Sequence, residues 1–261
     1  MTTSATETFK EERWQQILTV LAEHGRIRVP LLAARLHVSE ATVRRDLEAM
    51  QARGMLQRTH GGAVLPPPAA FEVSFDESQT RALAEKRAIG RRAAAMVRDG
   101  DSIIIESGST TLEFARCLGT FQRLTVLTNS LVIARELSNH EGIEVMLLGG
   151  TLRRQSASLV GPWVSEILQG MRVDNAFIGS NGISADFGLS APNPFTAASR
   201  RAMIDAARRR IALADHSKLG IESLYRVAPL SALHTLVTDA GGEEESLVPL
   251  REAGVEIVIA G

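Results

Sequence analysis

"VSEATVRRDLEAMQARGMLQRTHGG", residues 38–62, contains a short amphipathic helix followed by a glycine turn. Ser39 is a preferred N-cap residue, and Val43, Leu47 and Met50 recur at helical spacing, which predicts a buried stripe. At 100° per residue the remaining surface of the helix carries small, polar and basic side chains. They are Ala41, Thr42, Arg44, Arg45 and Glu48. The helix is therefore expected to present two adjacent arginines to a partner.

Two further helical patterns precede this stretch, over residues 11–23 and in "VPLLAARLHV" at 29–38. Three packed helices of which the last carries exposed arginines are typical of a helix-turn-helix whose last helix enters the DNA major groove. The fork of Arg44 or Arg45 suits a guanine edge or a phosphate, and Ser39 with the first-turn amides suits a phosphate. We therefore expect double-stranded operator DNA as a partner.

For two arginines alone, a solvated face paired with Asp46 and Glu48 would be the simpler interpretation. The segment "MLQRTHGGAVL" that follows adds evidence, because it alternates around Gly61–Gly62 and predicts a hairpin, or wing. Arg58 and His60 are expected to touch the DNA backbone or the minor groove beside the recognition helix.

Composition limits the class of protein. A chain of 261 residues suggests two domains, and a net charge of −1 means that a DNA site has to be local. The single cysteine, Cys117, excludes an internal disulfide framework and fits a reducing cytoplasm. No apolar run approaches the roughly 18 residues of a membrane span, and the polar start is unlike a secretory signal. We expect a cytoplasmic protein with no membrane partner.

Three consecutive prolines mark a domain boundary. They open "LPPPAAFEVSFDE", residues 65–77, and cannot continue a helix or a central strand. This predicts a winged helix-turn-helix domain over 1–65, a linker over 66–80 and a second domain over 81–261. A helix is expected from about Arg81 to Val97.

The second domain repeats a short apolar run, a polar or glycine-rich turn and a helix. The runs are "SIIIE", "LTVLT", "EVMLLGG", "NAFIG", "IALAD", "TLVTD" and "VEIVIA". Strands that alternate with helices predict an α/β domain with a mostly parallel sheet.

Polar turns follow these strands, at the edge where open α/β sheets bind ligands. In "ESGSTT" hydroxyls and helix-opening amides converge, which suits a phosphate. Each turn taken alone also fits ordinary loop chemistry; together they predict an anion site. Its candidates from the turns are Ser107, Gly108, Ser109, Thr110, Thr111, Asn129, Gly149 and Gly150.

Several other sites are not indicated. The sequence has neither the GxxxxGK[ST] loop of P-loop proteins nor the GxGxxG spacing of dinucleotide-binding proteins. Its six histidines show no tight pairing with cysteine or carboxylate. We therefore expect no metal and no cofactor.

The motifs resemble those of the DeoR family of transcriptional regulators over nearly the whole chain. The helix-turn-helix signature is carried by Arg13, Ile17, Leu21, Ser39, Thr42, Val43, Arg44, Arg45, Asp46 and Leu47, with "RTHGGA" as the wing. The second domain matches in "EKRAIGRRAA", "DGDSIIIESGSTT", "VLTNS", "LLGGTLR", "VDNAFIGSNGI" and "ALADHSKLG". The resemblance implies a sugar-phosphate sensor domain with a fold similar to ribose-5-phosphate isomerase. It also implies a pocket in which "GSTT" cradles phosphate, surrounded by Glu106, Asp174, Asn181, Asp215 and Lys218.

The sequence departs from the family pattern at this pocket. The family commonly has aspartate at Glu106, and a glutamate and a valine-lysine pair where this chain has Thr196 and Ser199–Arg200. Arg200 suits an anion but cannot act as a proton-transfer lysine, because its guanidinium stays charged. We expect a phosphorylated sugar or sugar acid different from that of the relatives.

Two functions remain open at this point. One is a DNA-binding regulator, usually a repressor in this family, that a phosphorylated metabolite controls and that acts as a dimer or tetramer. The alternative is a sugar-phosphate isomerase with an accessory DNA-binding domain, in which Glu106 or Asp215 would be the base and Lys218 the electrophile.

Overall fold

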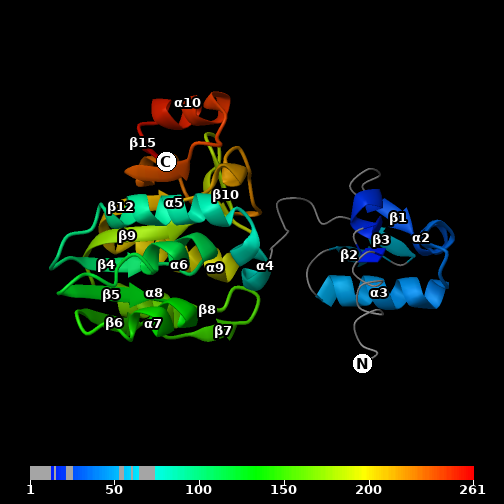
Figure 1. Ribbon diagram of the computed structural model, residues 1–261, viewed down its shortest axis with the longest axis horizontal. Helices are drawn as coiled ribbons and strands as arrows, with labels where there is room; N and C mark the ends of the chain where they lie inside the picture. Colours follow the sequence, from blue (N-terminus) through cyan, green and yellow to red (C-terminus); the bar gives the residue numbers. More distant parts are fainter. Residues whose placement is uncertain (1–12, 15, 22–25, 53–55, 60, 65–73) are drawn as a thin grey trace. The chain divides into compact units, whose positions relative to one another are not determined.

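A computed structural model of the chain describes residues 13–14, 16–21, 26–52, 56–59, 61–64 and 74–261 (Figure 1). The internal contacts divide the chain into two compact units, Met1–Val73 and Ser74–Gly261. No helix within the described ranges is long and apolar enough to cross a bilayer.

The first unit combines helices with a small antiparallel sheet. Residues 13–14 and 16–21 are helical, and α2 (Val29–Leu36) and α3 (Glu40–Ala52) follow. The strands β1 (Arg26–Arg28), β2 (Gln57–Thr59) and β3 (Gly62–Val64) form a sheet in the order β1-β3-β2. The fold is the predicted winged helix-turn-helix.

Apolar side chains from all three helical segments and from the wing share one core. They include Trp14, Ile17, Leu21, Leu32, Val43, Leu47, Met50, Leu56 and Ala63. The predicted stripe of α3 is thus confirmed as the buried face of that helix. Gly62 permits the wing to close on β1, since a Cβ there would lie 2.0 Å from the carbonyl oxygen of Ile27.

The second unit is built on a parallel sheet of seven strands in the order β15-β14-β12-β9-β4-β5-β6. In Figure 1 these strands follow one another from β15, near the top, to β6, near the bottom. The strands are β4 (Ser102–Ile105), β5 (Leu124–Thr128), β6 (Ile143–Leu147), β9 (Val173–Gly179), β12 (Ala207–Leu213), β14 (Thr235–Asp239) and β15 (Glu256–Ala260). All seven apolar runs of the sequence form strands, and the predicted α/β class is confirmed.

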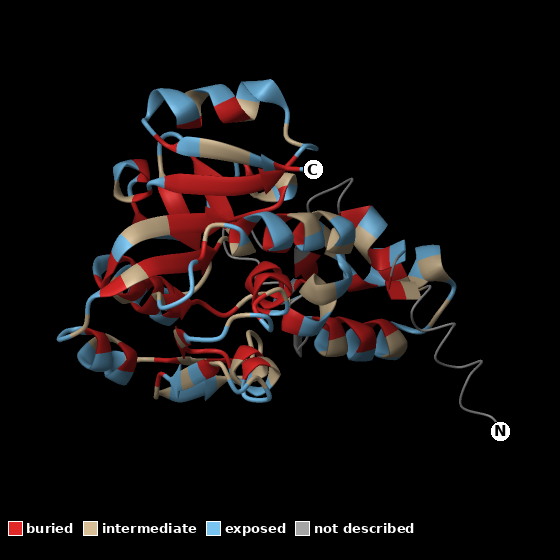
Figure 2. Cartoon of the chain, turned by 60° about the vertical axis from the view of Figure 1, so that its left-hand side comes forward, coloured by how far each residue is buried: buried red, intermediate tan, exposed pale blue. Residues whose placement is uncertain are grey.

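Helices cover both faces of the sheet, and each face has its own core. One core takes side chains from α5 (Leu83–Ala94), α6 (Ser109–Ala115) and α7 (Leu131–Leu137), and the other from α8 (Pro162–Leu168), α9 (Pro194–Asp205) and α10 (Glu244–Glu252). Successive residues of β4 alternate between the cores: Ile104 faces the second, and Ile103 and Ile105 face the first. Figure 2 shows the buried residues concentrated in the strands between these helices.

Two smaller sheets were not predicted. Strands β10 (Gly182–Ser184), β11 (Gly188–Ala191) and β13 (Tyr225–Ala228) form an antiparallel sheet, and β7 (Thr151–Arg153) pairs with β8 (Ser158–Val160). These strands are three or four residues long and lie in stretches whose sequence predicts loops.

The predicted linker over 66–80 is too long at its C-terminal end. Residues 75–80 form helix α4 (Phe75–Thr80), whose N-cap Ser74 accepts a hydrogen bond from the amide of Glu77 at 3.3 Å. Phe75 is buried in the core of the second unit, so α4 belongs to that unit. The remainder of the predicted linker lies outside the described residues.

Candidate functional site

The exposed face of α3 has the geometry of a recognition helix. Ser39 caps the helix: its Oγ accepts from the Thr42 amide at 3.2 Å and lies 2.9 Å from the Thr42 hydroxyl. Ala41, Arg44 and Arg45 are exposed, as the helical spacing predicted. The start of α3 therefore offers a hydroxyl-rich end and two guanidinium groups to a partner.

The arginines of this face differ in their partners. Arg44 is paired with Glu40 one turn earlier, at 3.0 Å, whereas Arg45 has no polar partner among the described residues. On the wing, the backbone amide of Arg58 donates to Oε1 of Gln51 at 2.8 Å, which ties the wing to α3. Arg58 is thereby held beside the recognition helix; His60 lies outside the described residues.

Asp46 braces α3 rather than facing a partner. It is buried, and its carboxylate accepts from Arg13 Nε at 2.5 Å, from Arg13 Nη2 at 3.0 Å and from the Trp14 indole at 3.1 Å. These bonds join α3 to the first helical segment, and the carboxylate raises the pKa of Arg13.

The second candidate site is a cavity of about 70 Å³ at the carboxyl ends of the neighbouring strands β12, β9 and β4. It is smaller than the roughly 300–1,000 Å³ of drug-sized ligand pockets, which indicates a small ligand or a single anionic group. Its lining residues are all polar, charged or glycine. The lining residues are Ser78, Lys86, Ser107, Gly108, Ser109, Thr110, Gly179, Ser180, Asn181, Arg200, Asp215 and Lys218.

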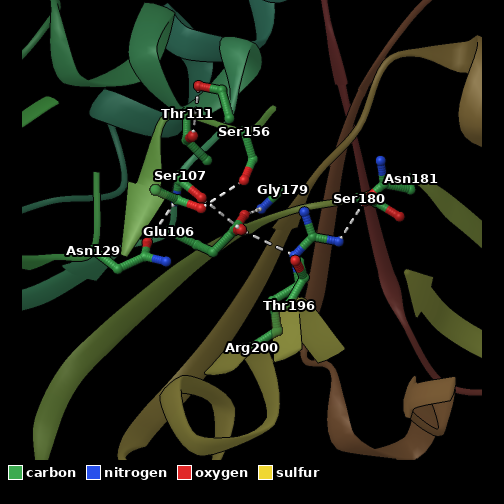
Figure 3. Close-up of polar contacts among 12 residues, drawn as sticks. Glu106, Ser107, Thr111, Asn129, Ser156, Gly179, Ser180, Asn181, Thr196 and Arg200 are labelled. Atoms are coloured by element: carbon green, nitrogen blue, oxygen red, sulfur yellow. Dashed lines mark hydrogen bonds and ion pairs between the residues drawn. The ribbon is translucent and has the colours of Figure 1, made fainter. Parts of the chain in front are cut away.

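A buried ion pair lies at this cavity (Figure 3). Arg200 Nε is 3.0 Å from Oε1 of Glu106, and the two side chains are 7% and 1% exposed. Arg200 Nη1 also donates to Oδ1 of Asn181 at 2.7 Å, and Oε2 of Glu106 accepts from the Gly179 amide at 3.1 Å. Burial raises the pKa of Glu106, and the charge of Arg200 opposes that rise. Glu106 and Arg200, which both depart from the family pattern, thus contact one another.

Three predicted residues stabilise the loop 107–110, which lines the cavity, without lining the cavity themselves. Asn129 Oδ1 accepts from the Ser107 amide at 2.9 Å, and its Nδ2 donates to the Leu159 carbonyl at 3.0 Å. The buried Thr111 hydroxyl donates to the Gly108 carbonyl at 3.0 Å. Together with Glu106 they fix the loop without lining the cavity.

Two lysines bring positive charge to the cavity. Lys86 comes from α5 and is 3% exposed; burial lowers its pKa, and the carboxylate of Asp215 counteracts this. Lys218 ends the short 3-10 helix His216–Lys218, which follows β12. That turn is fixed by the ring of His216, whose Nδ1 lies 2.8 Å from Asp239; this hydrogen bond raises the pKa of His216.

Three predicted site residues lie elsewhere. Asp174 is at the amino end of β9, on the opposite edge of the sheet, where it accepts from the Ser102 amide at 3.0 Å and the Ser102 hydroxyl at 2.7 Å. Gly149 and Gly150 follow β6, two strands away from β4, and do not line the cavity. Gly150 has φ +145° and a Cβ there would lie 2.6 Å from the Val160 carbonyl, so this glycine is explained by its close approach to β8.

Ser78, Lys86, Gly179 and Ser180 line the cavity but were not predicted. Lys86 lies on the buried face of α5 with Ile89 and Ala93, so helical spacing gives no indication that it belongs to a binding site. A compositional signal was available: of 29 lysines and arginines in the chain only three are lysines, and Lys86 and Lys218 are two of them.

The arrangement of this cavity is suited to holding an anion. Three cationic side chains, those of Lys86, Arg200 and Lys218, line it together with one carboxylate, Asp215, and several hydroxyls. The amides that open α6 have no helical acceptor and add donors. Among the described residues no group of histidine, cysteine and carboxylate side chains has the geometry of a metal site.

Known proteins resemble the chain along almost all of its length. The DeoR-like helix-turn-helix domain matches residues 13–68 and the DeoR C terminal sensor domain matches residues 81–240. The HTH-type transcriptional repressor GlcR of Bacillus subtilis is 38% identical, over 96% of both chains. The putative aga operon transcriptional repressor of Escherichia coli O157:H7 is 32% identical, over 96% of this chain and 94% of its own. The HTH-type transcriptional regulator GlpR of Haloferax volcanii is 34% identical, over 95% of this chain and 96% of its own.

Among solved structures, ribose 5-phosphate isomerase A of Methanocaldococcus jannaschii is similar at a TM-score of 0.38 and 20% identity, over 51% of this chain and 52% of that one. This likeness is too distant to bear on activity. The named relatives are regulators, which favours the regulator over the isomerase alternative.

Proposed function

Because this chain belongs to the DeoR family of transcriptional regulators, we propose that it represses a carbohydrate operon and that a small phosphorylated sugar or sugar acid controls its affinity for DNA. Operator DNA lies against α3 and the wing, and the effector lies in the polar cavity of the second unit. Two half-sites on a duplex need two recognition helices, so the active species is a homo-oligomer, a dimer or a tetramer.

The exposed surface of α3 supports the DNA part of this proposal. Arg45 has no polar partner in the described part of the chain and is therefore available for a base edge, whereas Arg44 is held by Glu40 and suits a phosphate. Ser39 and Thr42, at the start of the helix, add donors for a phosphate. Arg58, on the wing, suits the adjacent backbone.

Arg45→Ala is expected to weaken binding to a preferred duplex by about 1–3 kcal/mol and to relax the base preference at one position. The preferred duplex is first selected from a random library with the unmodified chain, and affinities are then measured by fluorescence anisotropy at fixed salt. Arg251→Ala, which removes an exposed charge from the second unit, serves as the matched control. Unchanged affinity and preference in Arg45→Ala would remove this residue from the interface.

The observation that carries the effector part is that Lys86, Arg200 and Lys218 converge on one cavity lined with hydroxyls. A phosphate monoester carries a charge of about −1.5 to −2 at neutral pH and accepts several hydrogen bonds, which matches this lining. Asp215 Oδ1 already accepts from the Ser217 amide at 3.1 Å and from the Ser217 hydroxyl, which leaves Oδ2 to accept from a sugar hydroxyl.

A ligand at 100 times its Kd is expected to stabilise the second unit by about 2.7 kcal/mol, which a thermal-shift screen of phosphorylated sugars and sugar acids detects. Lys218→Met and Thr110→Val should remove this shift while leaving DNA affinity without ligand unchanged, since neither residue is in the first unit. Arg251→Met is the control for loss of one charge. A normal shift in both cavity variants would move the effector to another site.

A further inference from the structure

We propose that Ser78 and Lys86 are ligand-binding residues, and that a phosphorylated ligand in the cavity clamps helix α4 onto the second unit. The inference rests on the effector site proposed above and adds a residue set and a mode of control to it. Its basis is the set of contacts that hold α4 in place.

Helix α4 is attached at two places. At its start, Phe75 is buried and its amide donates to the Gln155 carbonyl at 2.8 Å. At Ser78, the hydroxyl lies 2.8 Å from the Ser109 hydroxyl, and the carbonyl accepts from Lys86 Nζ at 2.5 Å. Ser109 and Lys86 both line the cavity, so the second attachment is made by the groups that would hold an anion.

An anion in the cavity need not break this attachment. The ammonium of Lys86 has three donors, and the Ser78 carbonyl is its one acceptor among the described residues. The remaining donors are available to phosphate oxygens, and a hydroxyl such as that of Ser78 or Ser109 can donate while it also accepts. Ligand binding and the docking of α4 therefore reinforce each other.

The buried position of Lys86 strengthens this coupling. The residue is 3% exposed, and the carboxylates of Asp215 and Glu113 oppose the lowering of its pKa by burial, Asp215 the more strongly. A bound anion adds another opposing charge, so the Lys86 ammonium, and with it the bond to the Ser78 carbonyl, is stabilised when the cavity is filled.

The position of α4 in the chain gives the clamp a consequence. The second unit begins at Ser74, and α4 begins at the next residue. Helix α4 is thus the first element of the second unit after the DNA-binding unit in the chain, so a change in its docking acts at the start of the second unit. A ligand that favours docked α4 shifts the population of that state, and the coupling acts in both directions.

Hydrogen exchange of the full-length chain with and without saturating inorganic phosphate tests the clamp. The amides of residues 75–80 are expected to exchange about 10-fold more slowly when phosphate is bound. Ser78→Ala should raise the Kd for phosphate about 10-fold and Lys86→Met about 100-fold, as expected for hydrogen bonds to a charged group. Thr80→Ala is the matched control on the same helix, because its exposed hydroxyl donates only to the Glu77 carbonyl.

Phe75→Ala separates a clamp from a passive contact. Phe75 does not line the cavity, so under the clamp its loss should raise the Kd for phosphate several-fold as well as speed exchange in α4. If phosphate binds the unmodified chain but neither α4 exchange nor the affinities of Ser78→Ala and Phe75→Ala change, the clamp is wrong and the effector site stands. If neither phosphate nor any phosphorylated sugar binds the unmodified chain, the proposed effector site and the proposed clamp are both wrong.

Discussion

Asp46→Ala is expected to lower the free energy of unfolding of the first unit by about 3–5 kcal/mol and to abolish DNA binding. The carboxylate is 3% exposed and accepts three hydrogen bonds from Arg13 and Trp14. Its removal deprives a guanidinium and an indole of a buried acceptor. The unit spans residues 1–73, and domains are stable by about 0.05–0.15 kcal/mol per residue, so this loss is a large fraction of the total.

Urea denaturation followed by Trp14 fluorescence measures this effect. The chain has two tryptophans, and a Trp163→Phe background leaves only Trp14, which is 4% exposed in the core of the first unit. Glu40→Ala is the control, because Glu40 is also a carboxylate of α3 but pairs with Arg44 at a position where both side chains are about half exposed. That pair should be worth about 0.5 kcal/mol or less. Similar losses in the two variants would show that Asp46 is not a brace.

The recognition helix could be predicted from sequence because its face is determined locally. Val43, Leu47 and Met50 lie on one side of α3 whatever the rest of the chain does, so Arg44 and Arg45 had to be exposed. That Asp46 sits next to the core rather than in solvent depends on Arg13 and Trp14, more than 30 residues earlier. Spacing within one helix does not contain that information.

The cavity shows where sequence reasoning succeeds and fails in the second unit. Residues after the apolar runs, such as Ser107 and Asn181, lie at the carboxyl edge as the rule for open α/β sheets requires. Asp174 precedes the run "NAFIG", so this rule places it at the other edge, where the structure has it, whereas the family resemblance implies a position at the pocket. Lys86 reaches the cavity from a helix, where no rule about strand ends applies.

The contact between Glu106 and Arg200 could not be predicted, although both residues were recognised as departures from the family pattern. It requires α9 to bring the Arg200 side chain to the residue that follows β4, and the two residues are far apart in the chain. Glu106, whose side chain is one methylene longer than the aspartate common in the family, and the guanidinium of Arg200 thus form one buried pair. This pair arises from the tertiary fold and cannot be predicted from either position alone.

Arg200→Met is expected to destabilise the second unit by about 3–5 kcal/mol at pH 8, because it leaves the Glu106 carboxylate buried without its counter-charge. Methionine fills a similar volume, so the effect reports the lost charge more than a lost contact. Burial already raises the pKa of Glu106 and Arg200 lowers it, so removing Arg200 raises that pKa further.

The pH dependence follows from this direction. An acid whose pKa is higher in the folded than in the unfolded state binds more protons when folded, so stability is greatest below the unfolded pKa of about 4.3 and falls as pH rises toward the folded value. The loss in Arg200→Met relative to the unmodified chain should therefore be smaller at pH 5 than at pH 8. Urea denaturation followed by circular dichroism across this range measures it.

The double variant Glu106→Gln/Arg200→Met isolates the cause. It removes both charges and keeps a polar side chain of nearly the same size at residue 106, where the Gly179 amide still finds an acceptor. The double variant should be more stable at pH 8 than Arg200→Met alone and should show a weaker dependence on pH, since the buried acid is gone. If both variants lose the same free energy at every pH, the lost packing of Arg200, and not an uncompensated Glu106 charge, is the source of the instability.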